Sequence, residues 1–98
     1  MEVKVEKIVG FKSGVSGTGE KYNMTGNVSV DKGVMTNIEV GIVKDGDGNQ
    51  VASFTYYGSL SIVFNTDDNT IMTNVITDIN SFIEYCKTNA AGFGTVTA

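Results

Sequence analysis

The sequence contains no histidine, arginine, tryptophan or proline, and it has a single cysteine. Without histidine the chain lacks the commonest general base near neutral pH and the commonest metal ligand. One cysteine cannot form an intrachain disulfide or a cysteine-rich zinc site. The Ser-His-Asp and Cys-His catalytic arrangements are therefore excluded. We expect a protein that is not an enzyme and that uses no cofactor and no metal.

Long apolar runs are also missing, since no stretch approaches the roughly 20 residues that cross a bilayer. The first seven residues alternate charged and apolar side chains, so they do not resemble a signal peptide. We expect no membrane partner and a cytoplasmic location, in a cell or in an infected host. The 98 residues are predicted to form a single domain over 1–98.

Charge of one sign dominates, with 11 acidic residues against 7 basic ones and a net charge of −4. Arginine supplies the two-pronged donor that suits phosphates and bases, so its absence from an acidic chain argues against duplex DNA as a partner. The same charge favours a basic protein partner, but it also serves solubility, and both interpretations stay open.

The hydrophobic spacing becomes helical in the last third of the chain. One apolar stripe contains Ile71, Met72, Val75, Ile76, Ile79, Phe82, Ile83 and Cys86. Asp67 and Asp68 precede it, where acids meet the positive end of a helix dipole, and Lys87 falls in the last turn. We predict a helix over about 68–89 and a loose tail over 90–98. The place of Cys86 on the stripe indicates a structural thiol.

The residues before 65 alternate as strands do. Asp31-Lys32-Gly33 predicts a three-residue hairpin loop that pairs Val30 with Val34 and Tyr22 with Ile42. This register puts one apolar face against the core and leaves a polar, nearly uncharged outer face. Gly26 would leave a gap opposite Ile38.

The other segments complete the predicted sheet. A first strand covers 3–11, residues 13–19 are expected to be a loop, and 45–49 form a turn. The run 51–65 is either one kinked strand or two strands joined at Gly58 and Ser59. The predicted class is α+β: an antiparallel meander of four to five strands within 2–65, with one C-terminal helix packed across one face. The predicted core consists of Val3, Val5, Val9, Phe11, Met24, Val28, Val30, Ile38, Val40, Ile42, Phe54, Leu60, Ile62, Phe64, Ile71, Val75, Ile76, Ile79, Phe82 and Ile83.

The outer face of the predicted sheet is the candidate interaction surface. Its polar residues have few charges that would prevent contact between sheets. The candidate interaction residues are Asn23, Thr25, Asn27, Asn37 and Glu39. We expect a small acidic module for protein interaction or assembly, either a phage-like structural protein or an inhibitor of a basic protein. It would bind a protein partner or associate with itself.

A second hypothesis comes from residues 13–22. The pattern Ser13-Gly14-Val15-Ser16-x-x-Gly19-x-x-Tyr22 resembles the DNA-binding wing of filamentous-phage single-stranded-DNA-binding proteins, which have an OB-like barrel. The resemblance implies that Lys12 and Lys21 lie against a nucleic-acid backbone and that Tyr22 stacks on a base. That wing is basic, whereas Glu20 precedes Lys21 here, and the predicted register places Tyr22 in the core.

Two further patterns favour plain loops. Gly14–Lys21 resembles a phosphate-binding loop, but Glu20 separates Gly19 from Lys21 and a strand follows. Residues 45–49 have the opening spacing of a calcium loop, but positions six and twelve are Gln50 and Tyr56. We expect turns in both places, and weak cation binding by 45–49 stays open.

Overall fold

The computed structural model describes residues 2–9, 12–19 and 21–92. For residues 2, 4–9, 12 and 13 it describes the backbone alone. The predicted core side chains of Val5 and Val9 belong to this group, and Phe11 lies outside the described residues.

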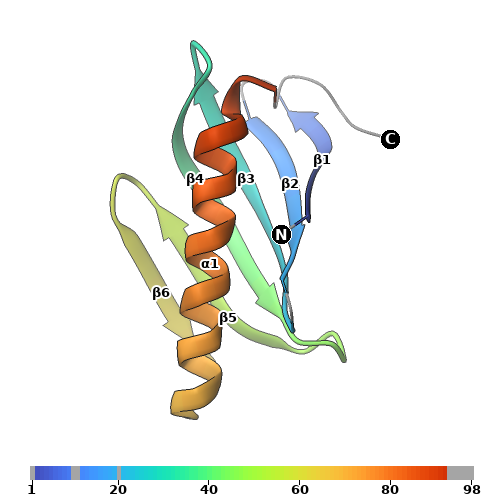
Figure 1. Cartoon of the computed structure of the whole chain (residues 1–98), viewed down its shortest axis with the longest axis vertical. Coiled ribbons are helices and arrows are strands. Elements are labelled where there is room, and N and C mark those ends of the chain that lie inside the picture. Colours follow the sequence, from blue (N-terminus) through green and yellow to red (C-terminus); the bar gives the residue numbers. More distant parts are fainter. Residues whose placement is uncertain (1, 10–11, 20, 93–98) are drawn as a thin grey trace.

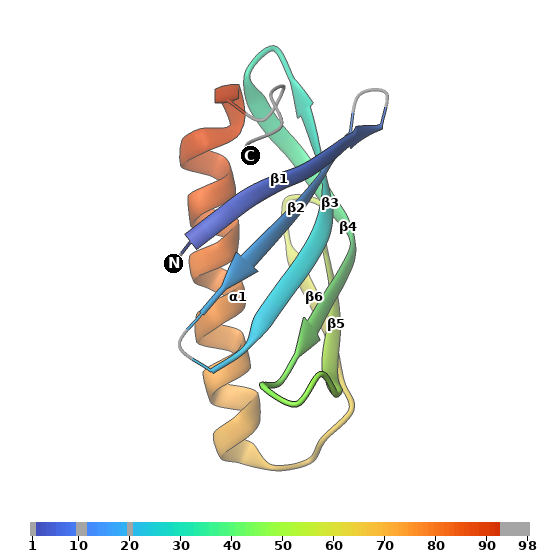
Figure 2. The same ribbon diagram turned by 90° about the vertical axis from the view of Figure 1, so that its right-hand side faces the viewer.

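Six antiparallel strands follow one another in sequence order, and a helix comes last (Figure 1). They are β1 (Glu2–Val9), β2 (Lys12–Thr18), β3 (Asn23–Asp31), β4 (Val34–Lys44), β5 (Gln50–Tyr56) and β6 (Leu60–Phe64), followed by α1 (Asn69–Asn89) and the short 3₁₀ helix η1 (Ala90–Gly92). Each strand pairs with its neighbour in the chain, and α1 covers one face of the sheet (Figure 2). The predicted α+β class, an antiparallel meander with a C-terminal helix, is confirmed.

The sheet has one strand more than the four to five expected, because residues 12–18 form β2 rather than a loop. Glycine weakens an isolated strand, but β2 is paired on both sides, with β1 and β3. The run 51–65 divides into β5 and β6. Gly58, with a φ of +81°, lies in the turn between them.

The register of the β3–β4 hairpin differs from the prediction. Its loop has two residues, Lys32 and Gly33, with φ of +53° and +79°, and Asp31 pairs with Val34. Positive φ at both positions is typical of a type I′ turn. The predicted pairing of Val30 with Val34 is therefore wrong.

Two bulges in β4 move the register further. The pairing shifts between Ser29 and Val30 and again between Thr25 and Asn27. Because side chains alternate, each extra residue turns the following ones to the other face. Thr25 rather than Tyr22 pairs with Ile42.

The second bulge reverses the predicted faces of Val40, Ile42 and Val43, and the two-residue loop does the same for Met35. Val40 is 61% exposed and Ile42 is half-buried, whereas Met35 and Val43 are buried. Ile76 on the helix is 40% exposed and was also wrongly assigned to the core. The predicted core residues that are buried are Met24, Val28, Ile38, Phe54, Val75, Ile79, Phe82 and Ile83. Those partly buried against them are Val3, Val30, Leu60, Ile62, Phe64 and Ile71. The buried residues missing from the predicted core are Val15, Tyr22, Met35, Val43, Ala52, Cys86 and Ala90.

Two glycines let the core close. A Cβ on Gly26 would lie 2.9 Å from Cγ2 of Ile38, so Ile38 itself fills the predicted gap. A Cβ on Gly17 would lie 2.6 Å from Cδ1 of Phe82, so this glycine lets the helix ring approach β2. Phe82 meets Phe54 edge to face, with ring centroids 6.1 Å apart.

The helix has the expected ends. Asp68 caps it, since Oδ1 accepts hydrogen bonds from the backbone N–H of Thr70 at 2.9 Å and of Ile71 at 3.1 Å. The first three residues of the predicted loose tail form η1, in which Ala90 is buried. Residues 93–98 lie outside the described residues. In the described part of the chain, no helix is long and apolar enough to cross a membrane.

Candidate interaction surface

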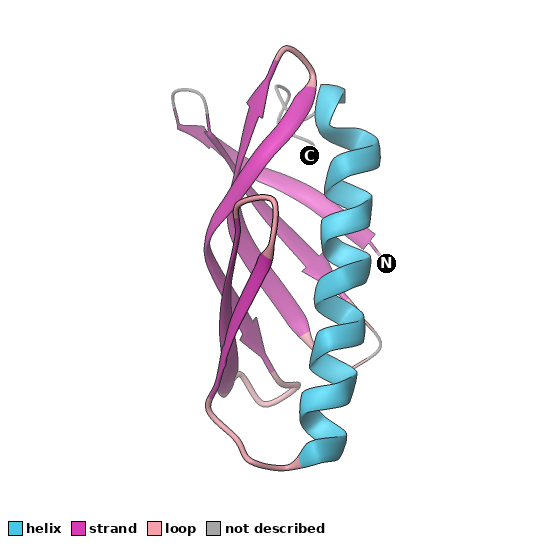
Figure 3. Ribbon diagram, turned by 90° about the vertical axis from the view of Figure 1, so that its left-hand side faces the viewer, coloured by secondary structure: helices cyan, strands magenta, loops and turns pink. Residues whose placement is uncertain are grey.

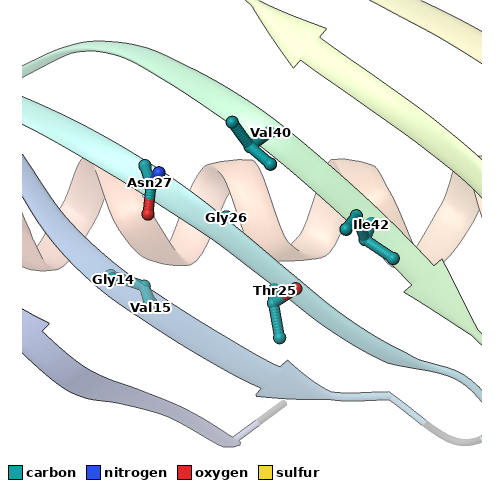
Figure 4. A pocket seen from close by; sticks show the side chains of 7 residues that line it. All are labelled: Gly14, Val15, Thr25, Gly26, Asn27, Val40 and Ile42. Atoms are coloured by element: carbon teal, nitrogen blue, oxygen red, sulfur yellow. The ribbon is translucent and has the colours of Figure 1, made fainter.

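The sheet face opposite α1 carries two shallow hollows that share Val40 and Ile42. The first has a volume of about 220 Å³ and is bordered by Thr25 and Asn27 of β3 (Figure 4). The second has a volume of about 350 Å³ and reaches Val63 of β6. No residue that lines either hollow is charged. We call this surface the outer patch and define it by Thr25, Asn27, Val40, Ile42, Ser53 and Val63.

Val40 is the centre of the outer patch. It lies in the second β4 bulge, with a φ of +52°. A β-branched residue rarely adopts this left-handed conformation, which costs an L-residue about 1–2 kcal/mol. The bulge also leaves this apolar side chain 61% exposed, so the strained backbone is not offset by much hydrophobic burial.

The predicted interaction residues are only partly brought together. Thr25 and Asn27 border the first hollow, and Thr25 is exposed whereas Asn27 is half-buried. Asn23 is exposed at the start of β3, away from both hollows. Asn37 and Glu39 are half-buried on β4, and Oδ1 of Asn37 is buried without a hydrogen-bond partner.

The apolar centre of the outer patch escaped the sequence analysis. Simple alternation places Val40 and Ile42 in the core, and bulges leave little trace in a sequence. The available signal is Gly41 directly after Val40, because glycine within a strand often marks a bulge. A Cβ on Gly41 would lie 2.6 Å from the ring of Phe54, which shows how tightly β4 approaches β5 there.

The alternative nucleic-acid residues occupy a different region. Lys21 is exposed, Tyr22 is only 7% exposed, and the backbone of Lys12 begins β2. Lys21 and Tyr22 meet Asp78 of α1 around a small hollow of about 130 Å³. Asp78 is half-buried there. The buried ring of Tyr22 and a carboxylate beside Lys21 both oppose stacking of a base and approach of a phosphate.

The thiol and the loop carboxylate have local roles. Burial raises the pKa of Cys86 to about 12, so the thiol stays protonated and is a poor nucleophile. Oδ1 of Asp45 accepts hydrogen bonds from the backbone N–H of Asp47 at 2.9 Å and of Asn49 at 3.0 Å. The loop itself therefore uses this carboxylate. Within the described residues, no group of three or more acidic or cysteine side chains is placed to hold a metal ion.

No protein-family model, no curated protein and no solved structure matches this chain. The function is therefore inferred from the outer patch itself, which is uncharged, apolar at its centre and bordered by hydroxyl and amide groups. Such a surface is suited to contact with another protein surface.

Proposed function

We propose that the protein is a non-enzymatic interaction module that binds another protein through the outer patch. The observation that supports this most is Val40, which is exposed and held at positive φ in the middle of the patch. Strained residues cluster at functional sites, where the surrounding structure maintains them. Covering Val40 would return part of its hydrophobic free energy, up to about 1.5–3 kcal/mol for a fully buried side chain.

The chemistry of the patch indicates the kind of partner. Two exposed valines, Val40 and Val63, are surrounded by hydroxyl groups such as those of Thr25 and Ser53, with no charge among them. A partner would present a broad apolar surface with polar groups at its rim. Both proposed roles, assembly into a particle and inhibition of a basic protein, fit this surface, and the net charge of −4 would add attraction to a basic partner.

The test uses two valines of almost equal exposure. Val40→Asn removes the apolar centre of the patch, and asparagine tolerates positive φ. Val34→Asn is the matched control, because Val34 is 64% exposed and lines neither hollow. Each immobilised protein is incubated with host lysate, and the bound proteins are quantified by mass spectrometry.

We expect a partner that wild type and Val34→Asn retain and that Val40→Asn loses. Titration of the purified partner should then show a Kd raised about tenfold or more by Val40→Asn, which corresponds to about 1.4 kcal/mol. Equal retention by all three proteins would reject the outer patch as the binding surface.

The nucleic-acid hypothesis has its own measurement. The chain has no tryptophan, so intrinsic fluorescence reports its four tyrosines. Titration with oligo-dT at low salt should leave this fluorescence unchanged if Tyr22 stays in the core. Quenching that disappears at high salt would instead support single-strand binding.

A further inference from the structure

The two edges of the sheet are protected very differently. The sequence of β1 has four charged residues, and its pairing with β2 contains a bulge between Val5 and Lys7. The sequence of β6, Leu-Ser-Ile-Val-Phe, has no charge and no proline, and its pairing with β5 is regular. Charges, prolines and bulges are the usual devices that prevent edge strands from pairing with other chains. Strand β6 lacks all three.

The hydrogen-bond pattern shows which groups of β6 are open. The N–H of Asn65 donates to the carbonyl of Val51 at 2.8 Å, and the N–H of Tyr57 donates to the carbonyl of Ser59 at 3.2 Å. In an antiparallel ladder such pairs recur at every second residue. Ser61 and Val63 therefore direct their backbone groups to β5.

The alternate residues Leu60, Ile62 and Phe64 direct their N–H and C=O groups to the free edge. Within residues 2–9, 12–19 and 21–92, no strand or loop forms a backbone hydrogen bond with this edge. The edge is thus a complete template for one more strand.

The helix leaves an apolar margin beside this edge. It packs mainly on β1, β3 and β4, and the β5–β6 hairpin lies to one side of it (Figures 1 and 3). Leu60, Ile62 and Phe64 are only partly buried. Nζ of Lys87 is 5.0 Å from the centre of the Tyr56 ring, so this flank of the helix faces β5. Ile76, which is 40% exposed, lies on the same flank. An added strand would therefore cover apolar side chains as well as satisfy backbone groups.

We propose that β6 pairs antiparallel with β6 of a second copy of this chain, about a two-fold axis at Ile62. Ile62 then faces Ile62 of the second copy, and Leu60 faces its Phe64. This register uses the open backbone groups of all three residues in both copies. The uncharged strand lets two chains of net charge −4 meet without close like-charge pairs. The proposal concerns the sheet edge and does not depend on a partner at the outer patch.

The dimer should be weak and should depend on concentration. Pairing of two five-residue strands forms an interface below the size of permanent dimers, so we expect a Kd of roughly micromolar order. The two outer patches would lie on one continuous sheet face, since Val63 belongs to β6 and to the patch.

The register can be tested with two cysteine variants, Ser61→Cys and Val63→Cys. In the proposed dimer, residue 61 of one copy faces residue 63 of the other in a non-hydrogen-bonded pair, with Cα atoms about 4.5 Å apart, which suits a disulfide. Residue 61 of one copy and residue 61 of the other are only diagonal neighbours, with Cα atoms about 7–8 Å apart, and the same holds for residue 63. This distance is too long for an unstrained disulfide. Mild oxidation of the mixed variants should give disulfide dimers at least about tenfold faster than either variant alone.

The native thiol does not interfere, because Cys86 is fully buried. A mixture of Val34→Cys and Ser61→Cys measures the rate of disulfide formation by random collision. Val34 is exposed at the β3–β4 hairpin and takes no part in the proposed β6 pairing. Sedimentation of the unmodified protein should show a mass that rises toward that of a dimer with concentration.

The proposal is overturned if the mixture reacts no faster than the single variants or the collision control, or if sedimentation shows only monomer at about 1 mM. The variant Ser61→Glu should shift the protein to monomer while circular dichroism stays unchanged, because it places like charges near the axis. Adding Val40→Asn to the cysteine variants should leave cross-linking unchanged, so failure of this proposal and failure of the outer-patch proposal give different results.

Discussion

Among the single residues, Val40 has the most unusual backbone. Replacing it with asparagine removes a β-branched side chain from positive φ, so we expect the free energy of unfolding to rise by about 1 kcal/mol. Urea denaturation followed by circular dichroism measures this change. Val34→Asn, at a position without positive φ, should give no such gain. If Val40→Asn and Val34→Asn lowered the free energy of unfolding equally, the backbone of Val40 would store no strain.

Asp45 gives a prediction about pH. Hydrogen bonds from the backbone, first from Asn49, lower the pKa of its carboxyl below the ordinary 3.8. A lowered folded-state pKa contributes stability that is present above the unfolded-state pKa and is lost as the pH falls through the folded-state pKa. Asp45→Asn keeps an acceptor oxygen but does not titrate, so its Tm should fall less than that of wild type on acidification below about pH 4. Asp47→Asn is the control, and an identical Tm profile for wild type and Asp45→Asn would contradict the prediction.

At the level of the elements, the contact between α1 and the sheet depends on Phe82. Its fully buried ring lies against Gly17 and Phe54. Phe82→Ala should lower the free energy of unfolding by about 3–5 kcal/mol, because it removes the ring and leaves a cavity. Tyr85→Ala, on the exposed side of the same helix, should cost less than about 1 kcal/mol. Thermal unfolding of the two variants compares them directly, and similar losses would mean that α1 is held by other contacts.

The elements also show which parts of the fold were predictable. The helix was predicted because its signals are local: a regular apolar stripe and the capping residue Asp68. The register of β4 was not, because its bulges depend on how the strand fits between β3 and β5. Strand β2 was missed since its glycines suggest a loop, and its neighbours supply the pairing.

The same distinction applies to the candidate site. Thr25 and Asn27 were correctly placed on the outer face, because they precede the bulges. Val40 lies in the second bulge and Ile42 follows it, so simple alternation assigned both residues to the wrong face. Alternation predicts a strand's faces only as far as its pairing is regular.

For the molecule as a whole, Cys86 reports on the closed core. Its thiol is fully buried on α1, so labelling requires the helix to leave the sheet or the protein to unfold. We expect an alkylating reagent at about pH 8 to react at least about 10³-fold more slowly than with the unfolded chain. Rapid labelling in native buffer would show that α1 opens without global unfolding.

The order of the elements has a consequence for synthesis on the ribosome. All six strands precede the helix that covers their apolar face, so a growing chain can complete its sheet before the cover exists. The 21 residues of α1 take roughly 1–4 s to translate at 5–20 residues per second. During that interval the strands that have already left the ribosome expose the core face without its cover. Closely spaced polysomes that carry this message would be the setting in which aggregation through that face has to be avoided.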